Sequence, residues 1–264
     1  MVHTGAIGAI VFNIIISFGL PLGLLAYLLV KYGRPVVRPV LVGVLVFLIM
    51  QMVIRIPLVM FIWPKTPAFA QLMLYPVSYG LFLGLTAGLA EEGGRWLGYT
   101  TILRKRTDWL SGFSYGVGHA GVESVVLVGM MSVNDLLYAL HINRGTLGPL
   151  VTGLEQRLLN RIQSYLVNLE PTVVMLEGVE RILVFVIQIA FSLMVLYGVR
   201  TKNAFWLALA ILAHTAVDAS VVILPKIMDF GPYKIQLLLL AWTIAGLWFI
   251  VKSRQMFSKV QPLK

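Results

Sequence analysis

Long apolar segments separated by short polar connections make up most of the chain. Each of seven such segments is long enough to cross a lipid bilayer as an α-helix, because about 20 apolar residues span a hydrocarbon core of roughly 30 Å. The third segment is too long for one straight helix, and Pro76 is expected to kink or restart it. The pattern predicts an all-α polytopic membrane protein in which residues 1–264 form a single domain. The approximate limits of the expected spans are 6–30, 39–62, 69–100, 109–131, 173–198, 204–224 and 233–251.

The longest connection, residues 132–172 between the fourth and fifth spans, has a helical pattern of its own. Apolar residues recur at helical spacing within 133–141 and again within 147–169. In the second stretch Arg157 and Arg161 lie between apolar residues, namely Leu147, Leu150, Val151, Leu154, Leu158, Ile162 and Leu166. This pattern predicts an amphipathic helix that lies on the membrane surface or folds over the mouth of a cavity, and both interpretations stay open.

The composition agrees with a membrane protein. The chain is 59% hydrophobic and 12% charged, whereas soluble domains carry about 25% charged residues. It contains no cysteine, which excludes disulfides, a thiolate nucleophile and a cysteine-ligated metal site. The first apolar segment lacks the basic start of a signal peptide, and we interpret it as a true span.

Basic residues are distributed unequally between the two sides of the predicted membrane. Because short cytoplasmic loops are rich in lysine and arginine, we expect the N-terminus outside the cell membrane and the C-terminus in the cytoplasm, with loop 132–172 external. We attribute the net charge of +10 to this asymmetry and to contact with anionic membrane lipids; without a soluble basic domain, no nucleic-acid partner is expected. The expected cytoplasmic segments carry Lys31, Arg34, Arg38, Arg104, Lys105, Arg106, Arg200, Lys202, Lys252, Arg254, Lys259 and Lys264, and the opposite side carries Lys65, Arg144, Arg157, Arg161, Lys226 and Lys234.

Seven ionisable side chains lie well inside the third, fourth and sixth predicted spans. A charge at the centre of a bilayer costs roughly 2.5–3.5 kcal/mol and is retained mainly where it has a function. Counted at about 1.5 Å per residue from the nearest charged residue on the cytoplasmic side, Glu92 and His214 lie about 18 Å deep and His119 about 16 Å deep. Three different helices therefore bring polar groups to one level. The full set is Glu91, Glu92, Arg95, His119, Glu123, His214 and Asp218.

The spacing of these residues adds detail to the predicted site. Glu123 and Asp218 each follow a histidine by four residues, so each shares a helix face with that histidine. Arg95 lies one turn beyond the glutamates, near enough to pair with either of them. Glycines along the third and fourth spans would allow close helix packing and bring the glutamates within reach of His119. We expect a polar chamber walled by spans three, four and six, within residues 69–225.

Carboxylates and imidazoles in such a chamber suit three kinds of chemistry. A glutamate can act as general base toward water, which is the chemistry of peptide-bond hydrolysis. His119, His214 and Glu92 could instead ligate Zn²⁺ with one position open, although the helical His-Glu-x-x-His signature is absent. Glutamates and histidines also build proton relays in transporters. A purely structural role is a further alternative, in which the glutamates form an ion pair with Arg95 or Arg55.

Charged residues at the start of the fifth span have a simpler interpretation. Glu177, Glu180 and Arg181 fall at the external interface by their place in the sequence. Glu177 and Arg181 are four residues apart, a favourable spacing for a helical ion pair. We interpret the three as surface electrostatics.

Three motifs resemble those of a known family. They are Glu91-Glu92-Gly-Gly-Arg95, Gly116-Val-Gly-His119-Ala-Gly-Val-Glu123 and His214-Thr-Ala-Val-Asp218. Together they resemble the YhfC-type intramembrane peptidases, within the wider group that contains type II CAAX prenyl endopeptidases, Abi proteins and PrsW. The resemblance covers roughly residues 70–225.

The resemblance implies an intramembrane endopeptidase acting on a membrane-embedded or membrane-adjacent peptide. It implies Glu91 as base, Glu92 as its support, His119 as a group that helps to hold and activate water, and His214 with Asp218 on the oxyanion side. Arg95 and Glu123 would support the site. A non-catalytic scaffold or regulatory relative of the same fold is the main alternative, and a proton-coupled transporter is a weaker one because no internal repeat is visible.

Overall fold

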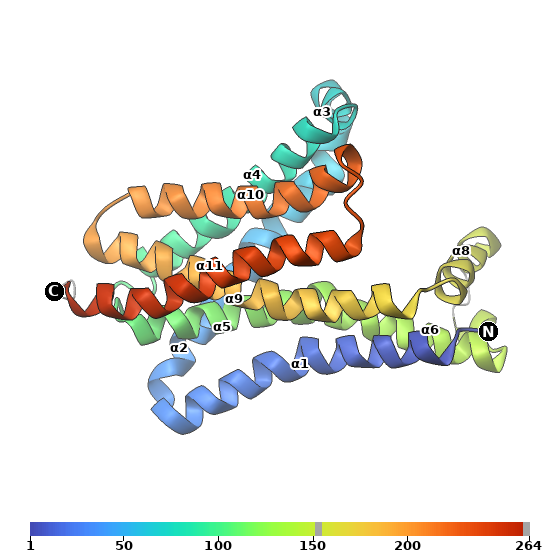
Figure 1. The fold of residues 1–264 in the computed structure, drawn as a ribbon, viewed down its shortest axis with the longest axis horizontal. Helices are drawn as coiled ribbons and strands as arrows, with labels where there is room; N and C mark the ends of the chain where they lie inside the picture. The colour runs from blue at the N-terminus through green and yellow to red at the C-terminus, as the bar shows by residue number, and fades with distance from the viewer. Residues whose placement is uncertain (151–154, 261–264) are drawn as a thin grey trace.

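The computed structural model describes residues 1–150 and 155–260, which are helical throughout apart from short connections (Figure 1). Six helical segments of this described part are long and apolar enough to cross a membrane, and a bent helix pair would make a seventh span. The first two are α1 (Thr4–Tyr32) and the segment Arg34–Lys65, which contains α2 (Val37–Phe47) and the π-helices η2 (Leu48–Arg55) and η3 (Leu58–Ile62). The last three are α9 (Pro171–Thr201), α10 (Phe205–Ile227) and α11 (Pro232–Ser258).

The bent pair consists of α3 (Pro67–Met73) and α4 (Pro76–Thr100), which meet at 116°. Pro76 occupies the first turn of α4, where a missing N–H costs nothing, and the preceding Tyr75 is extended, as residues before proline prefer. The prediction that Pro76 interrupts the third span is confirmed.

The helical segment that contains the fourth expected span is longer than the apolar pattern suggested. α5 (Trp109–Ser124), the π-helix η5 (Val125–Gly129) and α6 (Met130–Arg144) form one segment of 36 residues. The helix therefore continues past residue 131, where the expected span ends, because polar residues such as Asn134 and Asp135 do not interrupt backbone hydrogen bonding of a helix. The segment ends at Gly145, whose φ of 70° is a left-handed conformation that favours glycine.

The rest of the loop contains α7 (Leu147–Leu150) and α8 (Gln156–Val167). Val151 and Leu154, which belong to the predicted amphipathic pattern, lie outside the described residues. The apolar face of α8 packs through Ile162 and Leu166 against the N-terminal end of the chain and α6. A helix at one end of the bundle fits the interfacial interpretation of this segment.

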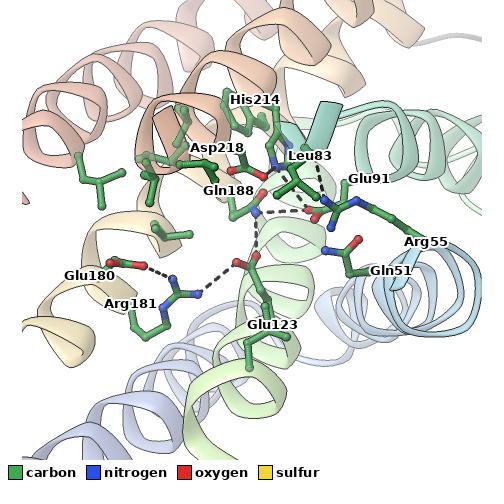
Figure 2. A pocket seen from close by; sticks show the side chains of 18 residues that line it. Gln51, Arg55, Leu83, Glu91, Glu123, Glu180, Arg181, Gln188, His214 and Asp218 are labelled. Atoms are coloured by element: carbon green, nitrogen blue, oxygen red, sulfur yellow. Dashed lines mark hydrogen bonds and ion pairs between the residues drawn. The ribbon is translucent and has the colours of Figure 1, made fainter. Parts of the chain in front are cut away.

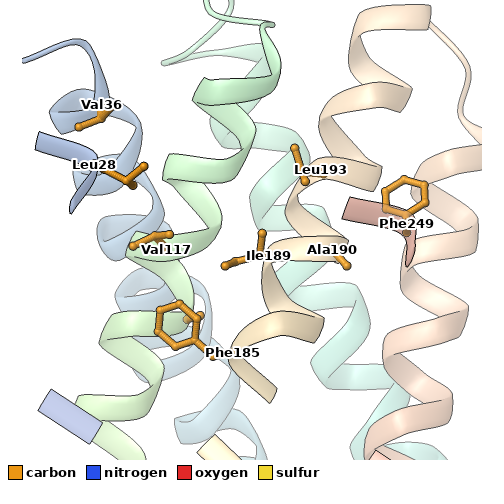
Figure 3. Packing of buried hydrophobic residues seen from close by; sticks show 9 residues of the cluster. Leu28, Val36, Val117, Phe185, Ile189, Ala190, Leu193 and Phe249 are labelled. Carbon is orange, nitrogen blue, oxygen red and sulfur yellow. The ribbon is translucent and has the colours of Figure 1, made fainter. Parts of the chain in front are cut away.

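The long helix α9 lies at the centre of the bundle and packs against α1, α4, α5, α10 and α11. Figure 3 shows one of its apolar contacts, in which Val117 of α5 faces Phe185 and Ile189 of α9. The α9 helix is consequently the most buried of the candidate spans.

Glycines bring the polar helices together. A Cβ on Gly118 of α5 would collide with the backbone carbonyl of Val40 in α2, so these helices touch backbone to backbone. Gly84 and Gly88 of α4 meet the backbone of α10 in the same way. The second contact holds α4 against the helix that carries His214.

Candidate functional site

Two adjacent glutamates of α4 point into different surroundings. Glu92 is fully buried, accepts a hydrogen bond from the Arg95 guanidinium, and has its Oε1 2.6 Å from Nδ1 of His214. Glu91 Oε2 lies 3.0 Å from Nε2 of His119 and 4.0 Å from Nε2 of His214. The predicted meeting of the third, fourth and sixth spans at one level is therefore present in the structure.

Arg95 is buried without any exposed area and contacts both glutamates. It forms an ion pair with Glu92 across three residues and lies 3.7 Å from Glu91 across four. Its second terminal nitrogen donates to Oε1 of Gln188 in α9. The Arg95 guanidinium thus has three polar partners inside the bundle, so it holds the two carboxylates in place and does not extend toward the membrane surface.

Gln188 is a residue that the sequence analysis missed. Because Arg95 donates to its Oε1, the amide Nε2 must point the other way, and it donates to Glu123 at 2.7 Å and to Glu91 at 3.4 Å. The amide thus bridges two carboxylates that come from different helices. The signal in the sequence was a glutamine in the middle of an apolar span, which is less conspicuous there than a charged residue.

Arg181 corrects the interpretation of the start of the fifth span. It is buried, with Nη1 3.3 Å from Glu123 and Nη2 2.7 Å from Glu180. The surface interpretation is wrong for Arg181, because its side chain is directed into the bundle, where it pairs with Glu123 of α5. Glu177 remains exposed and accepts from Asn13 rather than from Arg181.

His214 and Asp218 lie one turn apart on α10. With Nδ1 of His214 directed at Glu92, its Nε2 faces the opposite way and lies 3.6 Å from Oδ2 of Asp218. The Asp218 side chain is 40% exposed, far more than any other carboxylate of this cluster. Glu92 therefore fixes the orientation of the His214 ring, as an outer carboxylate does for a functional histidine.

A cavity of about 300 Å³ adjoins these groups (Figure 2). Its polar lining includes Glu91, Glu123, His214 and Asp218, whereas Glu92, Arg95 and His119 lie behind the wall. Five further polar residues line it that the expected chamber of three spans did not include, namely Gln51, Arg55, Glu180, Arg181 and Gln188. The second and fifth spans thus also contribute walls.

Comparison with known proteins gives the family. A sequence model of the family described as "YhfC intramembrane metalloprotease" matches residues 16–234. The chain belongs to the YhfC family. A relative from Bacillus subtilis (strain 168), described as "Uncharacterized membrane protein YhfC", is 28% identical over 243 residues, which is 92% of this chain and 94% of that protein. No solved structure matches.

Membership of the YhfC family and the apolar helices together make this an integral membrane protein. The family description names a metalloprotease, and one group of side chains has the composition of a metal site. Glu91, His119 and Glu123 each offer one ligand atom, and these atoms lie within 4.8 Å of one another. Imidazole nitrogen and carboxylate oxygen are both ligand types that zinc accepts, and a catalytic zinc site uses three protein ligands with a fourth position open.

The metal ligands suggested by the sequence were His119, His214 and Glu92, and only His119 belongs to this group. Glu92 faces Arg95 and His214 Nδ1, so both of these partners keep it away from the group. The charges nearby favour a cation: five carboxylates face three guanidinium groups, which leaves two negative charges in excess when both histidines are neutral. The carboxylates are Glu91, Glu92, Glu123, Glu180 and Asp218, and the guanidinium groups are those of Arg55, Arg95 and Arg181. The donor set therefore fits a divalent ion, which would replace the Gln188 amide as the partner of Glu91 and Glu123.

Proposed function

We propose that this protein is an intramembrane protease that hydrolyses peptide bonds of membrane-embedded or membrane-adjacent substrates. One observation carries the proposal. Glu91 lies in the wall of a cavity within the bundle, with its Oε2 held by His119 and within reach of His214. A carboxylate held in this way beside a space for substrate suits water activation.

The proposal assigns a task to each residue. Glu91, His119 and Glu123 would hold a divalent ion such as Zn²⁺. When bound, the ion would act as a Lewis acid toward the peptide carbonyl and would make water more acidic. The second oxygen of Glu91, for which no hydrogen bond exists in the described part of the chain, is available to take a proton from water.

His214 and Asp218 would act on the opposite side of the substrate carbonyl. Because Glu92 binds Nδ1 of His214, the Nε2 atom is free to carry a proton toward the cavity. From there it can donate to the developing oxyanion or to the leaving nitrogen. Asp218, 3.6 Å away, would stabilise the charged ring. Arg95 and Gln188 support the site by holding the carboxylates in place.

The test combines metal content with hydrolysis. We would purify the protein in detergent, measure bound metal by elemental analysis, and assay cleavage of a library of quenched fluorogenic apolar peptides. About one zinc per chain is expected in the wild type, with loss in Glu123→Gln and in His119→Ala but not in His214→Ala, because His214 lies outside the ligand group. Glu91→Gln should abolish hydrolysis and weaken metal binding without a loss of fold, because Glu91 is assigned both as a ligand and as the base.

Each alternative predicts a different result. Hydrolysis by a folded sample without metal would indicate water activation by glutamate alone. Folded protein that binds metal but cleaves no peptide would favour the non-catalytic scaffold. Proton uptake by proteoliposomes in response to a substrate gradient would instead support a transporter.

A further inference from the structure

Two polar side chains of the cavity wall take no part in the network around Glu91. Gln51 and Arg55 both belong to η2, the π-helix of the second span. They extend from the pale blue segment into the pocket, on the side away from Glu180 and Arg181 (Figure 2). Short π-helices are uncommon and often occur at functional sites, since the wider turn redirects side chains.

Arg55 differs from the other two arginines of the cavity region in its partners. It donates to the Thr86 hydroxyl at 3.2 Å and to the Leu83 carbonyl at 2.8 Å, both neutral acceptors. Among the described residues it has no carboxylate within 4.0 Å, whereas Arg95 and Arg181 each have two. A guanidinium has five N–H donors, so Arg55 keeps donors for a ligand.

Gln51 provides an independent observation. Its side chain is buried, with 6% of the residue exposed, yet it makes no hydrogen bond in the described part of the chain. A buried amide without partners is unfavourable, and native proteins rarely leave one in that state. It lines the cavity one helical turn before Arg55. A ligand that offers both a donor and an acceptor, as a peptide group does, would satisfy it.

We propose that Gln51 and Arg55 form a substrate subsite in which Arg55 binds a carboxylate of the peptide and Gln51 binds the adjoining peptide group. This inference rests on the proposed function for the nature of the ligand. A single negative charge suits the subsite better than a phosphate, because the carboxylates of Glu91, Glu123 and Asp218 line the same cavity and would repel a doubly charged group. The carboxylate belongs to an acidic side chain or to the C-terminus of the peptide.

The test measures binding separately from cleavage. In a Glu91→Gln background, we would titrate apolar fluorescent peptides that are identical except for Glu or Gln at one internal position and a free or amidated C-terminus. Peptides with the recognised carboxylate should bind roughly tenfold to a hundredfold more tightly than their neutral partners. Adding Arg55→Gln should remove this preference. If replacing the internal Glu by Gln weakens binding, the carboxylate belongs to a side chain. If amidation weakens binding, it belongs to the C-terminus.

Matched variants separate the subsite from general effects. Arg38→Gln is the control, because Arg38 also donates to a backbone carbonyl, that of Ile102, but lies outside the cavity. It should leave the preference unchanged. Gln51→Met should weaken all the peptides alike, by roughly threefold to tenfold, since it removes a contact with the peptide group. If Arg55→Gln does not fold, Arg55→Lys is the second variant. It keeps the charge but lacks the paired donors of the guanidinium, so it should retain only part of the preference.

The outcomes distinguish this inference from the proposed function. Wild-type cleavage without any preference for a carboxylate would overturn the subsite and leave the protease standing. A preference that depends on Arg55, in a protein that cleaves no peptide, would support the subsite and overturn the protease. Failure of every peptide to bind would overturn the subsite.

Discussion

Neighbouring residues on a helix differ in direction by about 100°, and the glutamate pair of α4 uses this difference. Glu91 faces the cavity, whereas Glu92 lies behind it between Arg95 and His214. The same chemical group therefore has two environments one residue apart. One carboxylate is placed for contact with a ligand, and the other holds the residues around it.

Replacement of Glu92 should chiefly affect stability. Glu92→Gln leaves the Arg95 charge without its closest partner in a buried site, and removal of one member of a buried ion pair typically costs about 3–5 kcal/mol. Glu91→Gln should cost less, because Glu91 adjoins the cavity. Thermal unfolding of both variants in the same detergent measures the difference. Equal midpoints would contradict the division of roles between the two glutamates.

Gln188 should be difficult to replace by an apolar side chain of similar size. Gln188→Met would remove the acceptor for Arg95 and the donor to Glu91 and Glu123, and buried groups left without partners cost about 1–3 kcal/mol each. Gln236→Met is the matched control, since the bonds of Gln236 are longer, at 3.3 and 3.4 Å. Thermal unfolding should show a clear loss for Gln188→Met only; a similar loss in both would argue against a special role for Gln188.

At this scale the sequence indicated most of the charged members of the site but neither of its two glutamines, Gln51 and Gln188. Glutamate and histidine are conspicuous in an apolar span because charge is costly there, whereas glutamine is not. Arg181 was misplaced for another reason. Distance from a helix end suggests depth in the membrane, but burial depends on which neighbouring helices enclose that turn.

Helices of this protein make their closest contacts at glycines, which have no side chain to keep the backbones apart. The contact of Gly118 with Val40 lets α5 and α2 touch, and Gly84 with Gly88 does the same for α4 and α10. Each of these polar helices is thereby held against a partner close to its residue of the candidate site. The glycines thus contribute to the site although none of them has a reactive group.

Gly118→Ala should destabilise the protein, because the added methyl group meets backbone that cannot rotate away. Overpacking of this kind costs about 1–3 kcal/mol. Gly23→Ala on α1 is the control, since nothing lies within 4 Å of its added Cβ. We expect a lower thermal midpoint for Gly118→Ala and an unchanged or higher one for Gly23→Ala. The reverse order would contradict the close contact of α2 and α5.

Apolar runs predicted which segments are helical and where Pro76 interrupts them, but not where the helices end. The helical segment that begins at Trp109 continues to Arg144, since a helix needs backbone hydrogen bonds and not apolar side chains. The π-helices were also outside the reach of the sequence, because no residue pattern distinguishes them from α-helix. One of them, η2, carries Gln51 and Arg55, which explains why the second span was absent from the expected chamber.

At the scale of the whole molecule, the start of α1 and the end of α11 lie at opposite ends of the bundle (Figure 1). This agrees with an odd number of spans, so that the bent pair α3 and α4 counts as one crossing. The basic residues favour a cytoplasmic C-terminus. That orientation is a proposal, and the composition of the chain makes it simple to test.

Because the chain contains no cysteine, single introduced cysteines report directly on orientation. Lys65→Cys should react with a membrane-impermeant maleimide on intact cells, whereas Lys105→Cys should react only after the membrane is opened. Both positions are exposed, so burial does not limit either reaction. Labelling in the opposite order would indicate the opposite orientation in the membrane. Labelling of both cysteines in intact cells would argue against the separation of these two loops by a membrane.

The residues that line the cavity come from helices far apart in the sequence, and this affects when the cavity can form during synthesis. Glu91 and Glu123 come from α4 and α5, but Gln188 and His214 are supplied by α9 and α10, and Leu239 of α11 closes part of the wall. Chains are synthesised from the N-terminus, so the glutamates enter the membrane long before their partners exist. A nascent or truncated chain that lacks α10 cannot form the cavity. The protein therefore acquires its interior site only when biosynthesis is almost complete.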